Sequence, residues 1–175
     1  MLNRLRQTRQ RDRLARKLCA GLSERARSPE FFAAFGVADS VDGRFDLVAL
    51  HAWLLFDRIG EGEEELSQAV MNEIFAQFDE ALRQLGNGEV GMRQRMKSVA
   101  QAFFGRMQAY TQAKDLPSLT QAIHRNVYRG QQGRELQAQA LAEYALSARA
   151  SLARMPSLDA ALQFDSLRPA ADFVS

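Results

Sequence analysis

The sequence FDLVALHAWLLFDRI occupies residues 45–59 and decides the fold class. It is apolar over nearly its whole length, with none of the alternation between apolar and polar residues that marks a half-buried strand. A helix that is apolar almost all round is typically buried among its neighbours. We therefore predict that residues 45–59 form the central helix of an all-α protein.

Glycine, proline and polar residues divide the rest of the chain into further helices. Apolar residues recur every three or four positions between these breaks, which is the helical period. The expected helices cover residues 29–36 (capped by Ser28), 63–85, 92–113, 117–130 and 134–154, with polar loops at 39–44 and 86–91 and a last short helix after Pro156. The prediction is a single-domain bundle of about six to eight helices, with a basic N-terminal helix or arm at 1–27, a body at 28–165 and a tail at 166–175.

The net charge of +2 conceals an uneven distribution of charge. Residues 1–27 carry nine Arg or Lys against two acids, a net +7, whereas the remainder carries −5. Such a basic segment indicates contact with something anionic. We expect that contact through Arg4, Arg6, Arg9, Arg11, Arg13, Arg16 and Lys17. Leucines at 14, 18 and 22 favour a docked helix, although a mobile arm remains an alternative.

Composition excludes several classes of protein. A lone cysteine, Cys19, excludes a disulfide framework and any cysteine-clustered metal site. The longest run without a charged residue, Leu47–Phe56, has ten residues, about half of the roughly 20 that a membrane-spanning helix needs. No apolar core of a secretory signal is present, and no clear transit peptide. We expect a soluble intracellular protein with no metal and no cofactor, in which neighbouring basic residues lower the pKa of Cys19.

Few residues offer catalytic chemistry. His51 and Trp53 lie in the apolar run and are interpreted as core residues, although a buried histidine is also able to ligate a metal. Asp39, Asp42 and Asp46 resemble a cation site of a helical isoprenoid or quinone enzyme, but no second acidic cluster faces them, and capping and turn formation explain them. None of these residues requires the protein to be an enzyme. A small helical regulator that binds RNA or the ribosome through residues 1–27 is the main alternative.

Several segments, in order and spacing, resemble the ubiquinol–cytochrome c chaperone family. The most specific are GVADSVDGRFD at 36–46 and RNVYRG at 125–130. Others are LHAWL at 50–54, residues 71–79 with two phenylalanines, LGNGEVG at 85–91, AFFGR at 102–106 and AY at 109–110. The similarity extends over roughly residues 22–165, nearly the whole body.

The resemblance implies a non-enzymatic, all-helical chaperone, a bacterial member of the family, that holds newly made cytochrome b during assembly of the respiratory bc complex. It also implies peripheral association with the cytoplasmic face of the inner membrane and, from the mitochondrial relatives, with the ribosome, but not with DNA. Because cytoplasmic loops of membrane proteins are basic, we expect the acidic residues after position 59 to meet the client. The expected client-binding residues are Asp42, Arg44, Phe45, Trp53, Glu63, Glu64, Glu65, Glu89, Arg95, Lys97 and Arg106.

Overall fold

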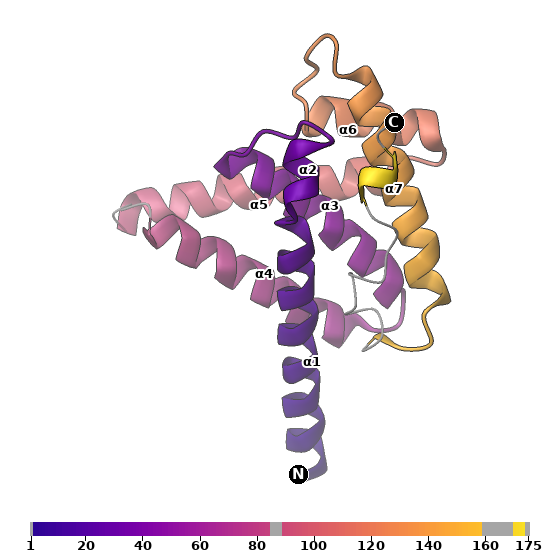
Figure 1. Cartoon of the computed structure of the whole chain (residues 1–175). Helices are drawn as coiled ribbons and strands as arrows, with labels where there is room; N and C mark the ends of the chain where they lie inside the picture. Colours follow the sequence, from indigo (N-terminus) through magenta and orange to yellow (C-terminus); the bar gives the residue numbers. More distant parts are fainter. Residues whose placement is uncertain (1, 85–88, 159–169, 174–175) are drawn as a thin grey trace.

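The computed structural model describes residues 2–84, 89–158 and 170–173, and in these ranges the chain forms helices and turns without a strand (Figure 1). The all-α prediction is therefore confirmed. The elements are α1 (Leu2–Ala26), α2 (Pro29–Ala33), α3 (Val41–Ile59), α4 (Glu64–Gln84), α5 (Glu89–Gln112), α6 (Leu116–Asn126), α7 (Glu135–Arg154) and the 3-10 helix η2 (Ala170–Phe173). None of the described helices has both the length and the apolar character that crossing a membrane requires.

Helix α3 lies at the centre of the bundle and packs against α1, α5 and α7. Every residue from Leu47 to Leu55 is buried except Val48, which is half-buried. Because neighbouring helices cover α3 on several sides, apolar residues occur around most of its circumference. The predicted central helix is confirmed.

The start of α3 differs from the prediction. The helix begins at Val41, four residues earlier than expected, because the Ser40 hydroxyl accepts a hydrogen bond of 3.1 Å from the Gly43 backbone N–H. A serine in this position satisfies one of the free N–H groups of the first turn. The Asp-Gly pair at 42–43 therefore belongs to a capped helix and not to the polar loop that turn chemistry had predicted.

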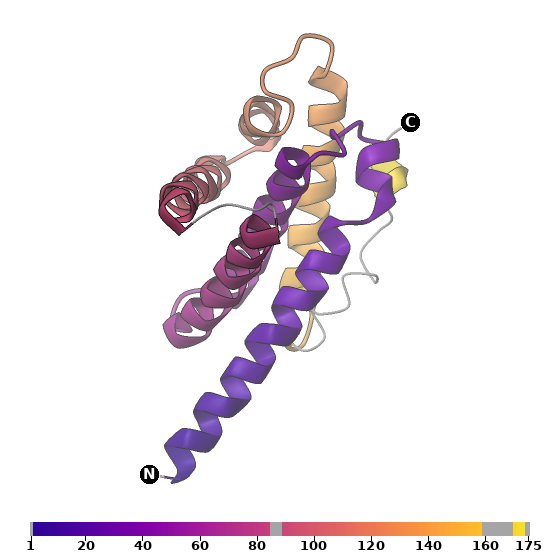
Figure 2. The same cartoon turned by 90° about the vertical axis from the view of Figure 1, so that its left-hand side faces the viewer.

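Helix α1 is docked over its second half and projects over its first half (Figures 1 and 2). Leu18 and Leu22 are completely buried, and α1 packs against both α3 and α4. The leucine stripe predicted from sequence is thus part of the core. Most residues before Arg11 are exposed, and this end of the helix extends beyond the body.

Helices α4 and α5 form a long hairpin that reaches away from the rest of the bundle (Figure 1). Gly60 and Gly62, with φ of 77° and 92°, make the turn that leads into α4. Helix α5 begins at Glu89, so Gly91 lies inside a helix and not in the predicted loop. Residues 86–88 of that loop are outside the described residues.

The C-terminal helices differ from the prediction mainly at their ends. Asp115 and Ser118 form a capping box at the start of α6, which ends at Asn126 because Arg129 and Gly130 adopt left-handed φ angles of 56° and 68°. Ser28, predicted as a cap, makes no side-chain capping bond to α2. In the predicted tail, the described part forms η2 and packs against α7, while the helix predicted after Pro156 falls mostly on residues outside the description.

Candidate functional site

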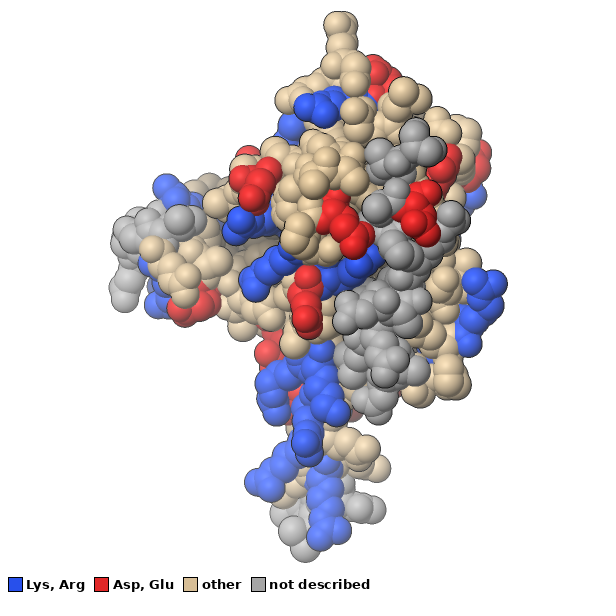
Figure 3. Space-filling model, in the orientation of Figure 1, with Lys and Arg blue, Asp and Glu red and all other residues tan. Residues whose placement is uncertain are grey.

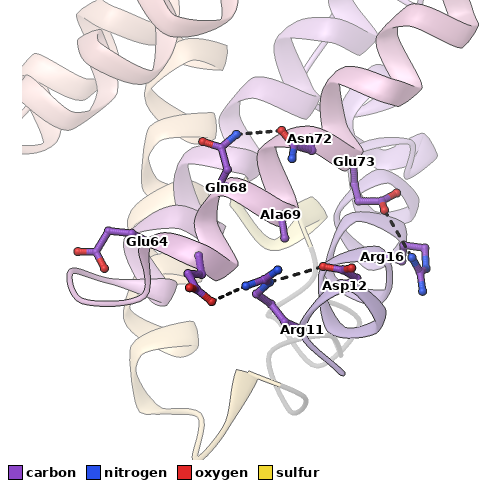
Figure 4. Close-up of a pocket in the computed structure, with 9 residues that line it drawn as sticks. Arg11, Asp12, Arg16, Glu64, Gln68, Ala69, Asn72 and Glu73 are labelled. Carbon is purple, nitrogen blue, oxygen red and sulfur yellow. Dashed lines mark hydrogen bonds and ion pairs between the residues drawn. The ribbon is translucent and has the colours of Figure 1, made fainter. Parts of the chain in front are cut away.

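A charged groove of about 640 Å³ lies between α1 and α4 (Figure 4). Arg11 of α1 forms an ion pair with Glu65 of α4 and a longer one, of 3.5 Å, with Asp12. One turn further along, Arg16 approaches Glu73 of α4 to 3.9 Å. Part of the basic segment therefore neutralises part of the acidic face of α4 within the same molecule.

Three acids beside this groove remain exposed. Glu61, Glu63 and Glu64 have no ion-pair partner among the described residues. They lie in the turn before α4 and at its start. Together with Glu65, these residues are called the acidic end of α4 below. Because Glu65 is paired with Arg11, Glu61, Glu63 and Glu64 carry the charge available to a partner.

A second group of predicted residues surrounds the start of α3. Asp42 is exposed, and Arg44 pairs with Asp39 at 2.8 Å. Phe45 is half-buried, and the Arg106 guanidinium lies 4.9 Å from the centre of its ring. The 19 residues of α3 span about 27 Å, and they separate this group from the acidic end of α4. The predicted residues thus form two groups and not one surface.

Arg106 is held by a buried carboxylate. Asp46 of α3 is completely buried, and its oxygens lie 2.7 Å from Arg106 Nε of α5 and 2.7 Å from Arg129 Nη1 in the turn after α6. Burial raises the pKa of Asp46, and the two guanidinium groups oppose that shift. The cluster joins three parts of the chain that are distant in sequence, so Arg106 has a structural partner that sequence spacing could not reveal.

The aspartates considered as a cation site are engaged separately. Asp39 binds Arg44, and Asp46 binds Arg106 and Arg129. No group of three or more His, Cys, Asp and Glu side chains within the described ranges is placed to hold a metal ion. The side chain that caps α3 is Ser40, and Asp46 lies within the helix in a buried ion-pair cluster, so the turn and capping interpretation does not hold for Asp46.

His51 belongs to a buried hydrogen-bonded chain. Its Nδ1 lies 2.8 Å from the Leu47 carbonyl oxygen and its Nε2 lies 2.9 Å from the Tyr144 hydroxyl, which is itself 3.1 Å from Arg25 Nε. Since a carbonyl only accepts and arginine only donates, Nδ1–H donates to Leu47 and Nε2 accepts from Tyr144. Burial lowers the pKa of His51 to about 4. The core interpretation of His51 is confirmed.

Replacing Tyr144 with Phe is expected to destabilise the fold by about 2 kcal/mol, because it leaves Nε2 of His51 and Nε of Arg25 buried without their partner. Urea denaturation followed by circular dichroism measures the loss. Tyr110 provides the control, since its hydroxyl is buried with no hydrogen-bond partner among the described residues. The Tyr110→Phe variant should be as stable as the parent or slightly more so. Equal losses in the two variants would contradict the assigned network.

Trp53 and Cys19 are core residues as well. Trp53 is 4% exposed, and its ring contacts Tyr110 and the Arg149 guanidinium, so its side chain is not presented to a partner. Cys19 points into the α1–α4 interface, where Gln77 donates to its sulfur. Burial, together with Glu73, raises the pKa of the thiol to about 11. The expected lowering of this pKa is therefore wrong, because burial of the thiol and the nearby Glu73 carboxylate both disfavour the thiolate.

An aromatic cluster on the hairpin was not predicted. Phe75 and Phe78 of α4 pack against Phe103 and Phe104 of α5, with ring centres 5.6–5.9 Å apart. Phe103 is buried, whereas Phe104 is 50% exposed. Sequence periodicity identifies an apolar face on each helix, but it does not show which rings meet across the hairpin.

The remaining predicted residues lie on α5, towards the tip of the hairpin. Arg95 and Lys97 are exposed. Glu89 is the first residue of α5, and its side chain is outside the description. These residues belong to neither of the two groups above.

Comparisons with known proteins agree with this architecture. A family model described as "Ubiquinol-cytochrome C chaperone" matches residues 33–162. A crystal structure of the Cbp3 homolog from Brucella abortus is similar over 100% of both chains, with 30% sequence identity and a TM-score of 0.81. No curated protein matches the chain. The family match includes α3, the α4–α5 hairpin, α6 and α7.

Proposed function

The chain belongs to the ubiquinol–cytochrome c chaperone family, and we propose that it is a non-enzymatic chaperone that binds newly synthesised cytochrome b during assembly of the bc complex. The family match is the observation that carries this proposal. The structural similarity to the Cbp3 homolog supports it. The buried, neutral state of His51 and the raised pKa of Cys19 are consistent with a binding protein, since neither group is placed for catalysis.

The acidic end of α4 is the proposed contact with the client. A polytopic membrane protein carries an excess of Lys and Arg in its cytoplasmic loops. Glu61, Glu63 and Glu64 are exposed and have no ion-pair partner among the described residues, so a basic loop meets them without breaking an existing pair. Complementary charge of this kind increases the rate of encounter and fixes orientation more than it increases affinity.

The exposed residues at the start of α3 and two cations on α5 extend the proposed client surface. Asp42 is exposed at the start of α3, Arg95 and Lys97 are exposed on α5, and Phe45 is half-buried. Trp53 and Arg106 are not carried into the proposal, because one is buried and the other is held by Asp46. We therefore propose client contacts at both ends of α3 and on α5 towards the tip of the hairpin.

Replacing both Glu63 and Glu64 with Lys is expected to weaken capture of cytochrome b at least about tenfold, because each substitution puts a cation opposite basic loops. Capture is measured by affinity purification of the tagged full-length chain from detergent-solubilised membranes, with quantification of cytochrome b. Chemical cross-links from the acidic end of α4 to cytochrome b in the parent would support the same surface.

Glu24→Lys together with Glu135→Lys is the control, since both residues are exposed and the change in net charge is the same. Glu135 is also in the first turn of its helix, so the control reproduces the cost of placing a cation at a helix N-terminus. If both double variants capture equal amounts of cytochrome b, the acidic end of α4 is not the contact.

We further propose that the protein works at the cytoplasmic face of the inner membrane, held there by an anionic surface in contact with α1. The net charge of residues 1–27 supports this proposal. Peripheral binding would place the acidic end of α4 near the loops of a membrane-inserted client.

A further inference from the structure

The six cations of α1 from Arg6 to Lys17 divide into two sets that the sequence does not distinguish. Arg11 and Arg16 face α4 and form ion pairs with it. The other four cations are exposed and have no ion-pair partner among the described residues. This second set, called the outer row, consists of Arg6, Arg9, Arg13 and Lys17.

The outer row forms a line on one face of the helix. Its members are separated by three, four and four residues, a spacing that places side chains one above another. The row extends over about 16 Å of helix. The single acid between residues 4 and 17 is Asp12, and it pairs with Arg11. Within the part of the chain that the structure describes, no acid therefore neutralises the charge of the outer row.

The position of the row makes it accessible to a large flat partner. The first half of α1 projects from the body, and Lys and Arg side chains cover much of its visible surface (Figure 3). A helix that extends beyond the bundle is able to lie against a plane without interference from the other helices.

Leu5 indicates which anionic partner this is. Its side chain is 56% exposed, and it precedes Arg9 by four residues, so it borders the outer row. Nucleic-acid phosphates gain nothing from an exposed leucine, and α1 has no aromatic residue on which a base could stack. An interfacial helix, in contrast, combines cations with apolar side chains that enter the boundary between headgroups and acyl chains.

We propose that the outer row docks α1 on anionic phospholipid headgroups, with Leu5 entering the interface. This inference rests on the proposed function, since it supplies the membrane contact of the chaperone. The pairs of Arg11 and Arg16 with α4 remain intact in the docked state and keep the acidic end of α4 beside the lipid surface.

The test is flotation of the full-length chain with phosphatidylcholine vesicles that do or do not contain phosphatidylglycerol. Binding is expected only with phosphatidylglycerol. Each cation near an anionic leaflet contributes about fivefold to affinity, so replacing Arg6, Arg9 and Arg13 with Gln should weaken binding on the order of a hundredfold. Leu5→Gln should weaken it severalfold. Gln is a good helix former, so both variants should keep the circular dichroism of the parent.

The matched control replaces Lys114, Arg125 and Arg154 with Gln, which removes the same charge from exposed positions elsewhere. It should bind vesicles as the parent does. Equal loss in the two triple variants, or full binding by the outer-row variant, overturns the proposal. RNA binding that depends on the outer row, without vesicle binding, also overturns it and assigns the row to nucleic acid.

Failure of this inference is separable from failure of the proposed function. Capture of cytochrome b in detergent does not require vesicle binding. A chain that captures cytochrome b but does not float with anionic vesicles disproves the lipid contact alone. A chain that floats but captures no cytochrome b leaves the lipid contact standing and disproves the proposed client.

Discussion

Replacing Arg106 with Met is expected to destabilise the fold by about 3 kcal/mol at pH 7, because it removes one partner of a buried carboxylate. Asp46 would keep only Arg129, whose side chain is 42% exposed and therefore a weaker partner. Methionine is an unbranched apolar residue, so it removes the guanidinium from Asp46 and from the Phe45 ring but keeps an apolar stem at this position. Urea denaturation gives the change in the free energy of unfolding.

The pH dependence of this variant has a definite sign. Removing a cation raises the pKa of Asp46 further, so that the folded state takes up a proton at higher pH than the unfolded state. Stability contributed by that protonation is present at low pH and lost as the pH rises through the folded-state pKa. The deficit relative to the parent should therefore be smaller at pH 4.5 than at pH 7.

Two further variants decide whether the buried charge is the cause. Adding Asp46→Asn to Arg106→Met should recover part of the stability and remove the difference between the two pH values. Arg83→Met breaks an exposed pair with Asp79 and should cost about 0.5 kcal/mol or less. A loss in Arg106→Met no larger than that of Arg83→Met would show that Asp46 tolerates the missing partner.

The fold was predictable from sequence where one local pattern determined it. The apolar run at 45–59 and the leucines at 14, 18 and 22 identify buried helical faces because burial requires those residues at those spacings. Helix starts were less predictable. The Asp-Gly pair at 42–43 is a strong turn signal, yet the capping bond from Ser40 and the passage of the chain over Gly43 convert it into the first turn of α3.

The candidate site was predictable in its charges but not in its pairing. Sequence separates a basic segment from an acidic one, and the structure then shows that Arg11 and Glu65 belong to each other. The same holds for Asp46, whose partners are 60 residues away on α5 and further still after α6. No spacing rule specifies contacts at such distances, because they depend on how the whole bundle packs.

These pairings give α1 two faces with different roles. The inner face carries Leu18 and Leu22 into the core and Arg11 to α4, which fixes the direction of the helix. The outer face carries the outer row, for which the described ranges supply no ion-pair partner. The proposed membrane contact on the outer face of α1 and the proposed client contact at the acidic end of α4 are connected through the packing of α1 against α4, so that docking would orient the proposed client-binding residues.

Replacing Gly43 with Ala is expected to cost about 3 kcal/mol, at the upper end of what overpacking typically costs. A Cβ atom at this position would lie 1.9 Å from the Ala38 carbonyl oxygen and 3.0 Å from its carbon. Both are backbone atoms in the turn that leads to Ser40, so no side-chain rotation relieves the clash. Relief requires movement of residues 38–40, which carry the cap of α3. Thermal and urea denaturation measure the loss.

Gly105→Ala is the matched control, because Gly105 is inside α5 and an added Cβ would meet no atom within 4 Å. Alanine there should stabilise the chain by about 0.5–1 kcal/mol, since it restricts the unfolded state and favours helix. Opposite signs for the two substitutions follow from geometry alone, as both glycines are helical. If Gly43→Ala is as stable as the parent, the chain does not pass as close to the start of α3 as the structure places it, and the early start of the helix loses its explanation.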